Sequence, residues 1–165
     1  MKFLTKSLLC SAVLAAGVAQ AGVPAVERTQ YFNAAAHCQA SLSKFDDALR
    51  KRPLAVQNEG TTSVFVTCSI PTQGQVQGLE VYVSSQDGSD APVACTAVTG
   101  WHGGTNYYAT KVSDTAYGYG GFFWNASDFV EGATEFPTSF LAMSCQLAPG
   151  TGLNDFWLHY SETVG

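Results

Sequence analysis

Aromatic residues and glycines gather between residues 101 and 124, and these side chains offer the best chemistry for holding a ligand. Aromatic faces can stack on sugar rings or on the apolar patch of a partner, and glycines let a ligand approach the backbone. The candidate ligand-binding aromatics are Trp101, Tyr107, Tyr108, Tyr117, Tyr119 and Trp124. The same side chains also suit the core of a β-sandwich, because aromatics are good strand formers. The sequence leaves both interpretations open.

Three acids, Asp128, Glu131 and Glu135, are the candidates for catalysis. Two carboxylates that face each other across a cleft can cleave a glycosidic bond. Gly132 and Pro137 lie among these acids, however, and such residues are more typical of a solvated loop. The sequence contains no Gly-x-Ser-x-Gly, no His-Glu-x-x-His and no phosphate-binding loop. It therefore favours a protein that acts by binding or as an envelope component, without catalysis and without a cofactor. The alternatives are a carbohydrate-binding or adhesive module that uses the aromatic loops and a small secreted hydrolase that uses paired carboxylates.

Four cysteines follow the N-terminal region: Cys38, Cys68, Cys95 and Cys145. No two of them are spaced as Cys-x-x-Cys and the histidines are scattered, so a zinc site is not indicated. An even number in an oxidising compartment predicts two disulfides. The pairing of Cys38 with Cys68 and Cys95 with Cys145 closes the smallest product of loop lengths. Closure entropy separates the three connectivities by only about 1 kcal/mol, so the others stay open.

The N-terminus has the features of a secretory signal peptide. Lys2 and Lys6 precede an apolar stretch centred on residues 8–18, and Ala19-Gln20-Ala21 supplies small residues at alternate positions. We expect cleavage after Ala21 and a secreted or periplasmic protein. The apolar stretch is shorter than the ~20 residues that span a bilayer, so no membrane span is expected in the mature chain.

The charge balance narrows the choice of partners. The whole chain has 8 Lys plus Arg and 13 Asp plus Glu, and without Lys2 and Lys6 the net charge is −7. An acidic surface repels phosphate backbones, which excludes nucleic acid as the expected partner. A glycan or an envelope protein remains, and we expect a monomer.

Alternation of apolar and polar residues predicts strands over most of the mature chain. The segments are 63–70, 79–84, 93–99, 139–147 and 156–160, with two further strands in the aromatic region. Residues 54–57 and 63–70 are expected to form a hairpin, and residues 43–51 a short helix that Pro53 ends. The pattern predicts one antiparallel β-sandwich domain over residues 22–165, jelly-roll or immunoglobulin-like, with one short N-terminal helix.

The phase of the alternation also orients the cysteines. Cys68, Cys95 and Cys145 each share a face with apolar neighbours in their strands, so they are expected to point into the core. Two packed sheets lie about 10 Å apart, and inward disulfides could tie one sheet to the other.

The order of segments resembles a loose group of uncharacterised exported bacterial proteins. The matching features are Cys38, the strand ending in Val64-Phe65-Val66-Thr67-Cys68-Ser69-Ile70-Pro71, the strand Leu79-Glu80-Val81-Tyr82-Val83, the strand with Cys95, and Met143-Ser144-Cys145-Gln146-Leu147-Ala148-Pro149-Gly150. The resemblance implies a secreted, disulfide-bonded β-sandwich and transfers no functional residues. The helix expected at 43–51 departs from that pattern.

Overall fold

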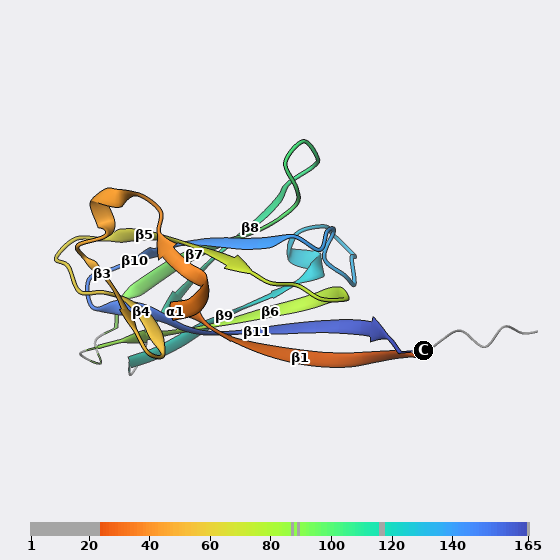
Figure 1. Ribbon diagram of the computed structural model, residues 1–165, viewed down its shortest axis with the longest axis horizontal. Helices are drawn as coiled ribbons and strands as arrows, with labels where there is room; N and C mark the ends of the chain where they lie inside the picture. The colour runs from red at the N-terminus through yellow and green to blue at the C-terminus, as the bar shows by residue number, and fades with distance from the viewer. Residues whose placement is uncertain (1–23, 87, 89, 116–117, 165) are drawn as a thin grey trace, which may run out of the picture.

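The computed structural model describes residues 24–86, 88, 90–115 and 118–164, and these form two antiparallel sheets packed face to face (Figure 1). Sheet A has the order β3-β4-β11-β6-β9, and β1 also pairs with β11. Its strands are β1 (Ala25–Asn33), β3 (Leu49–Arg52), β4 (Ala55–Asn58), β6 (Gln75–Ser85), β9 (Tyr119–Asn125) and β11 (Thr151–Thr163). Residues 1–21, where the signal peptide is predicted, lie outside the described residues.

Sheet B has the order β2-β5-β10-β7-β8. Its strands are β2 (Cys38–Ala40), β5 (Val64–Ile70), β7 (Pro92–Thr99), β8 (Tyr107–Asp114) and β10 (Leu141–Leu147). From β4 to β11 the chain crosses between the sheets at every step except from β7 to β8. Eight strands divided in this way follow the jelly-roll order and not the immunoglobulin-like one.

The core lies between the two sheets and is built from the inward residues of each alternating strand. In β5 the residues Val64, Val66, Cys68 and Ile70 are buried, whereas the residues between them are exposed. The strands β6, β7 and β10 alternate in the same way. The predicted phase of these strands is therefore confirmed, because one-sided burial is what an alternating strand provides.

Helical structure is scarce among the described residues, and the helix expected at 43–51 is wrong. Ser43–Phe45 form a single 3-10 turn, and Leu49–Arg52 form β3. The described α-helix is α1 (Ala34–His37), capped by the Asn33 side chain, which accepts from the N–H of Ala35 at 2.8 Å. The helix expected at 43–51 would be too short to be stable by itself. Pairing with β4 gives residues 49–52 a hydrogen-bond ladder instead.

The expected hairpin of residues 54–57 with 63–70 is also wrong. Strand β4 pairs with β3 and β11 in sheet A, whereas β5 pairs with β2 and β10 in sheet B. The buried Asn58 side chain stabilises the connection from β4 to β5, since its Nδ2 donates to the carbonyls of Thr62 and Leu147. Both strands bury one face, and alternation by itself cannot distinguish neighbours in one sheet from strands in facing sheets.

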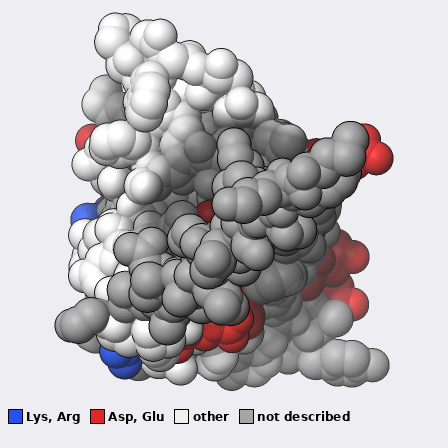
Figure 2. Space-filling model, turned by 90° about the vertical axis from the view of Figure 1, so that its right-hand side faces the viewer, with Lys and Arg blue, Asp and Glu red and all other residues white. Residues whose placement is uncertain are grey.

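Among the described charged side chains, acids outnumber bases on the surface seen from the end of the sandwich at which β11 finishes. Figure 2 shows Asp and Glu in several places on this side and Lys and Arg in only a few. This agrees with the excess of acids in the sequence.

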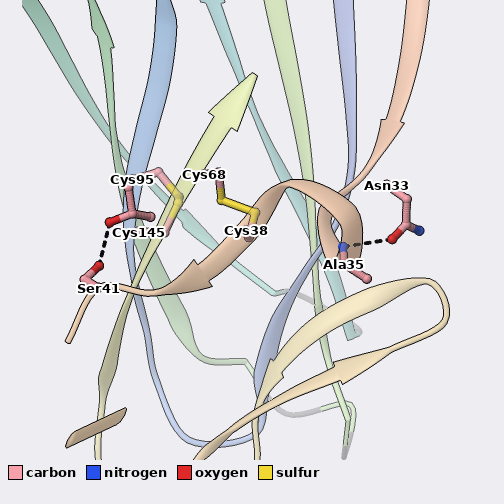
Figure 3. The surroundings of a disulfide bond; sticks show 8 residues. Asn33, Ala35, Cys38, Ser41, Cys68, Cys95 and Cys145 are labelled. Atoms are coloured by element: carbon pink, nitrogen blue, oxygen red, sulfur yellow. Dashed lines mark hydrogen bonds between the residues drawn. A yellow bond between two sulfur atoms is a disulfide. The ribbon is translucent and has the colours of Figure 1, made fainter. Parts of the chain in front are cut away.

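The predicted pairing of the cysteines is confirmed, but the bonds do not tie one sheet to the other. Cys38 bonds to Cys68 and Cys95 bonds to Cys145, as Figure 3 shows. Each pair consists of direct partners on adjacent strands of sheet B. The side chains point inward as expected. The sheets are therefore held together by apolar packing, and both disulfides brace sheet B alone.

Candidate functional site

Five aromatic side chains lie on the outer face of sheet A, and we call them the aromatic platform. They are Tyr31, Tyr82, Tyr119, Phe123 and Trp157. Tyr31 is the register partner of Trp157, and Glu80 separates Trp157 from Phe123 in the same row. The exposed fractions of Tyr31, Tyr119 and Phe123 are 66%, 77% and 48%. Large apolar side chains gathered on a solvent face are the signature of a binding surface.

Trp157 is the centre of the platform. Its ring centroid lies 5.0 Å from that of Tyr31, with the planes at 86°, and 4.9 Å from that of Tyr82. Aromatic pairs prefer such edge and tilted arrangements. The indole is therefore held in one orientation while remaining partly exposed, which lowers the entropy lost when a ligand stacks on it.

A line of polar contacts crosses the platform from β1 to β6. The Thr29 hydroxyl lies 3.1 Å from Nδ1 of His159, and Nε2 of His159 lies 2.9 Å from the Glu80 carboxylate. The Tyr82 hydroxyl donates to the same carboxylate at 2.6 Å. This hydrogen bond lowers the pKa of Glu80. Burial acts in the opposite direction, whereas the hydrogen bond and the charge of His159 lower the pKa further. The hydrogen bond from Tyr82 to Glu80 also raises the pKa of Tyr82 to about 12, so this phenol stays neutral.

The order hydroxyl, imidazole and carboxylate in Thr29, His159 and Glu80 is that of a nucleophilic triad, but the setting differs. Catalysis of acyl transfer also needs hydrogen-bond donors aimed at the developing oxyanion. Backbone N–H groups of paired strands lie in the plane of the sheet and cannot point above its face. The polar line therefore connects three strands and holds the side chains of Tyr82 and His159 in place on the outer face of sheet A.

An irregularity in β11 shapes a hollow beside Trp157. The register with β6 shifts between Leu153 and Phe156, so Asn154 and Asp155 have no partner on β6. Bulges re-aim side chains and are frequent next to functional sites. Both residues line a hollow of about 220 Å³, together with Tyr82, Val83, Tyr119, Gly120 and Trp157. A polar hollow of about 380 Å³ adjoins it across Tyr119 and Asn154.

Two glycines of sheet A lie where a side chain would meet a close neighbour. A Cβ on Gly78 would lie 3.0 Å from the Phe123 ring, so the absence of a side chain lets that ring lie flat over β6. A Cβ on Gly120 would lie 2.2 Å from the carbonyl oxygen of Asp114. Glycine at residue 120 is therefore required by the close approach of the backbone at Asp114, on the side of β9 that faces away from the platform.

The six aromatics predicted from the sequence do not form one site. Tyr119 belongs to the platform, but Tyr108 is exposed on the outer face of sheet B and Trp101 lies in the loop between β7 and β8. That loop stands at the top of Figure 1, away from the outer face of sheet A. Tyr107 begins β8 and is half-buried, and Tyr117 lies outside the described residues.

Trp124 is a core residue, so of the two interpretations that the sequence left open, core packing holds for this ring. Its side chain is fully buried, its ring stacks on Phe122 at 5.2 Å, and its Nε1 donates to the carbonyl of Ala109 at 3.0 Å. In β9 the phase of alternation puts Phe122 and Trp124 inward and Phe123 outward. Three consecutive aromatics obscured this phase in the sequence.

The acids considered for catalysis have structural or solvent-exposed positions. Asp128 accepts from the N–H of Asn125 in a capping box at the 3-10 turn Ala126–Asp128, and its carboxylate pairs with Lys111 at 2.8 Å. Glu131 is exposed and Glu135 is half-buried. None of these acids lines the two hollows next to Tyr119 or a third hollow on sheet B. The geometry brings no pair of these carboxylates to a cleft.

Acid should weaken the fold through Asp128 and Glu80. Burial raises the pKa of Asp128, yet the hydrogen bonds from Lys111 and Asn125, with the charge of Lys111, leave it below its ordinary value. A carboxyl with a lowered pKa stabilises the fold above its ordinary pKa of about 4 and loses that contribution as the pH falls. When the pH falls from about 5 to 2, the Asp128→Asn variant should therefore lose up to about 1 kcal/mol less unfolding free energy than the wild type does.

Urea unfolding at a series of pH values measures this effect, with exposed Glu131→Gln as the control. The Asp128→Asn profile should be flatter than that of the wild type, and the control profile should follow the wild type. Equal slopes for all three proteins would contradict a role for the contacts of Asp128 in acid stability.

A larger hollow, of about 430 Å³, lies on sheet B between β5, β7 and β10. Phe140 is its one aromatic lining residue, and no charged side chain lines it. It therefore offers less for oriented recognition than the platform, where rings, an amide and carboxylates converge.

The described residues contain neither a metal-binding cluster nor a membrane-spanning helix. Among them, no group of three or more His, Cys, Asp or Glu side chains is arranged to hold a metal ion. No helix in residues 24–164, as far as these are described, has the length and apolar character needed to cross a membrane.

No protein-family model and no curated protein sequence matches this chain. Among solved structures, it is similar to the carbohydrate-binding module TmCBM61 in complex with β-1,4-galactotriose, with 9% identity and a TM-score of 0.37 over 84% of this chain and 88% of that one. It is also similar to a CBM4 structure, with 8% identity and a TM-score of 0.33 over 81% of this chain and 86% of that one. At these values the likeness carries no inference about what this chain binds.

Sequence reasoning missed four of the five platform residues, although part of the signal was present. Tyr82 alternates with buried Val81 and Val83, and Trp157 alternates with buried Phe156 and Leu158. An aromatic out of phase with the core residues of its own strand marks a solvent-facing ring. Tyr31 had no such signal, because strand β1 was not predicted.

Proposed function

We propose that this chain is an exported, non-catalytic protein that binds glycans on the aromatic platform of sheet A. One observation carries the proposal: five rings from four adjacent strands lie on one solvent face around Trp157, with hydrogen-bonding groups between them. Chance exposure would scatter such rings singly over the surface.

The platform combines the two kinds of contact that a sugar needs. The apolar face of a sugar ring packs on an aromatic face, while its hydroxyl groups require hydrogen-bond partners. Trp157 and Tyr82 offer the faces, and Glu80 and Asp155 offer acceptors. Tyr31, Trp157, Tyr82 and Tyr119 lie on the adjacent strands β1, β11, β6 and β9, which spans roughly 14 Å across the sheet. A chain of several sugar rings fits this length better than a single sugar does.

Export belongs to the same proposal. We infer a secreted or periplasmic protein that is cleaved after Ala21, supported by the two disulfides, which persist in oxidising compartments. The resemblance to exported bacterial proteins points the same way. The mature protein acts as a monomer on a glycan, and an envelope protein is the competing partner.

Titration with soluble polysaccharides tests the proposal through tryptophan fluorescence. Trp124 is fully buried and Trp101 lies in a distant loop, so a Trp101→Phe variant reports mainly on Trp157. A saturable change with at least one member of a panel of neutral, amino and acidic glycans is expected. A flat response across the panel, together with a dimer that dissociates on Tyr31→Ser, would instead assign the platform to contact between two copies of the chain.

A further inference from the structure

The hollow beside Trp157 has the composition of a site for an organic cation. Three of its lining residues are aromatic, Tyr82, Tyr119 and Trp157, and one is the carboxylate Asp155. No Lys or Arg lines it. Aromatic faces carry negative electrostatic potential and attract ammonium groups, most strongly where the cation is partly removed from water.

Asp155 lacks a partner of its own. Among the described residues it forms no ion pair and no side-chain hydrogen bond, in contrast to Glu80 and Asp128. It is half-buried next to Trp157. A carboxylate held in part away from water without a cation costs free energy, and a ligand that brings a positive charge offsets that cost.

Asn154 adds a polar wall to the hollow, but its amide oxygen is closed to solvent. Oδ1 of Asn154 is buried and has no hydrogen-bond partner among the described residues. Asn154 lies beside Asp155 in the bulge and lines both hollows next to Tyr119. An ammonium group has three N–H donors and no acceptor, so in this hollow it can donate to the Asp155 carboxylate, the one charged group in the lining.

We propose that this hollow is the subsite for a protonated amino group of the bound glycan. The protein then prefers glycans with free amino sugars over neutral glycans, and it disfavours acidic ones. The inference rests on the proposed function of the platform and adds to it the class of sugar that the platform selects. Acidic sugars are disfavoured because both Asp155 and Glu80 lie on the platform.

Two oligosaccharides of equal length test the preference directly. A tetramer of β-1,4-linked glucosamine is compared with its fully N-acetylated form, in about 0.15 M salt to screen long-range attraction. We expect the free amine to bind at least about tenfold more tightly. Asp155→Asn should reduce the ratio of the two affinities to within about twofold, whereas Asp47→Asn, which removes an equal charge from an exposed turn, should leave the ratio unchanged.

A smaller probe separates the cation site from the rest of the platform. Choline should compete with the bound glucosamine tetramer, whereas its uncharged carbon isostere 3,3-dimethylbutan-1-ol should not. Equal affinities for the two tetramers, or equal competition by choline and its isostere, would overturn the inference and leave glycan binding intact. Failure of every glycan to bind would instead refute the proposed function, and the two failures are therefore distinguishable.

Discussion

Replacing Trp157 with alanine will lower the affinity for the bound glycan by about thirtyfold, equivalent to about 2 kcal/mol. The indole lies at the centre of the platform, in contact with Tyr31 and Tyr82, and also lines the hollow with Asp155. Its removal takes away the main stacking face and frees both neighbouring rings. Isothermal titration with the tightest member of the glycan panel measures the change.

Two variants show whether the loss is specific to this ring. Trp101→Ala removes an exposed indole from the loop between β7 and β8 and should leave the affinity unchanged. Tyr82→Phe keeps the ring but removes the hydroxyl that donates to Glu80, so it should cost less than Trp157→Ala. Wild-type affinity in Trp157→Ala, or its loss in Trp101→Ala, would contradict the assignment of the site to sheet A.

Loss of either disulfide will destabilise the fold by about 3 to 4 kcal/mol. The bonds close loops with sequence separations of 30 and 50 residues, and the entropy of the unfolded chain rises when these loops open. A small domain has a total stability of about 5 to 15 kcal/mol, so removing both bonds consumes a large part of it. The Cys95→Ala/Cys145→Ala variant should lose slightly more than Cys38→Ala/Cys68→Ala, because its loop is longer.

Urea unfolding of the two variants and of the reduced wild type measures this effect. Mass determination after alkylation confirms how many thiols are free in each sample. An unchanged unfolding midpoint in protein with four alkylated thiols would contradict the prediction. Because both bonds lie within sheet B, the variants also test whether sheet A and its platform survive when sheet B is weakened.

Local patterns predicted much of the architecture. The alternation in β5, β6, β7 and β10 and the inward direction of three cysteines are observed as predicted. The disulfide pairing is also observed, although the sequence separated it only weakly from its alternatives. The helix predicted at residues 43–51 is not observed. Its apolar spacing fits a helix, but pairing of Leu49–Arg52 with β4 overrides this local preference.

The aromatic content indicated binding, but of the six residues that it indicated only Tyr119 belongs to the platform. A cluster in sequence, such as residues 117–124, alternates between the core and the solvent once it becomes a strand, so Trp124 is buried and Phe123 is exposed. The platform draws instead on Tyr31, Tyr82 and Trp157, which are separated by most of the length of the chain. No window of sequence contains them together.

The sequence by itself determined features that depend on near neighbours: several of the strand segments, the buried face of β5, β6, β7 and β10, the excess of acids and the number of cysteines. The tertiary structure decided which strands became neighbours. Strand β11 lies between β1 and β6, and its irregularity places Asn154 and Asp155 in the lining of the hollow beside Trp157. The physical reason is that alternation acts between adjacent residues, whereas strand pairing is chosen by the packing of the whole core.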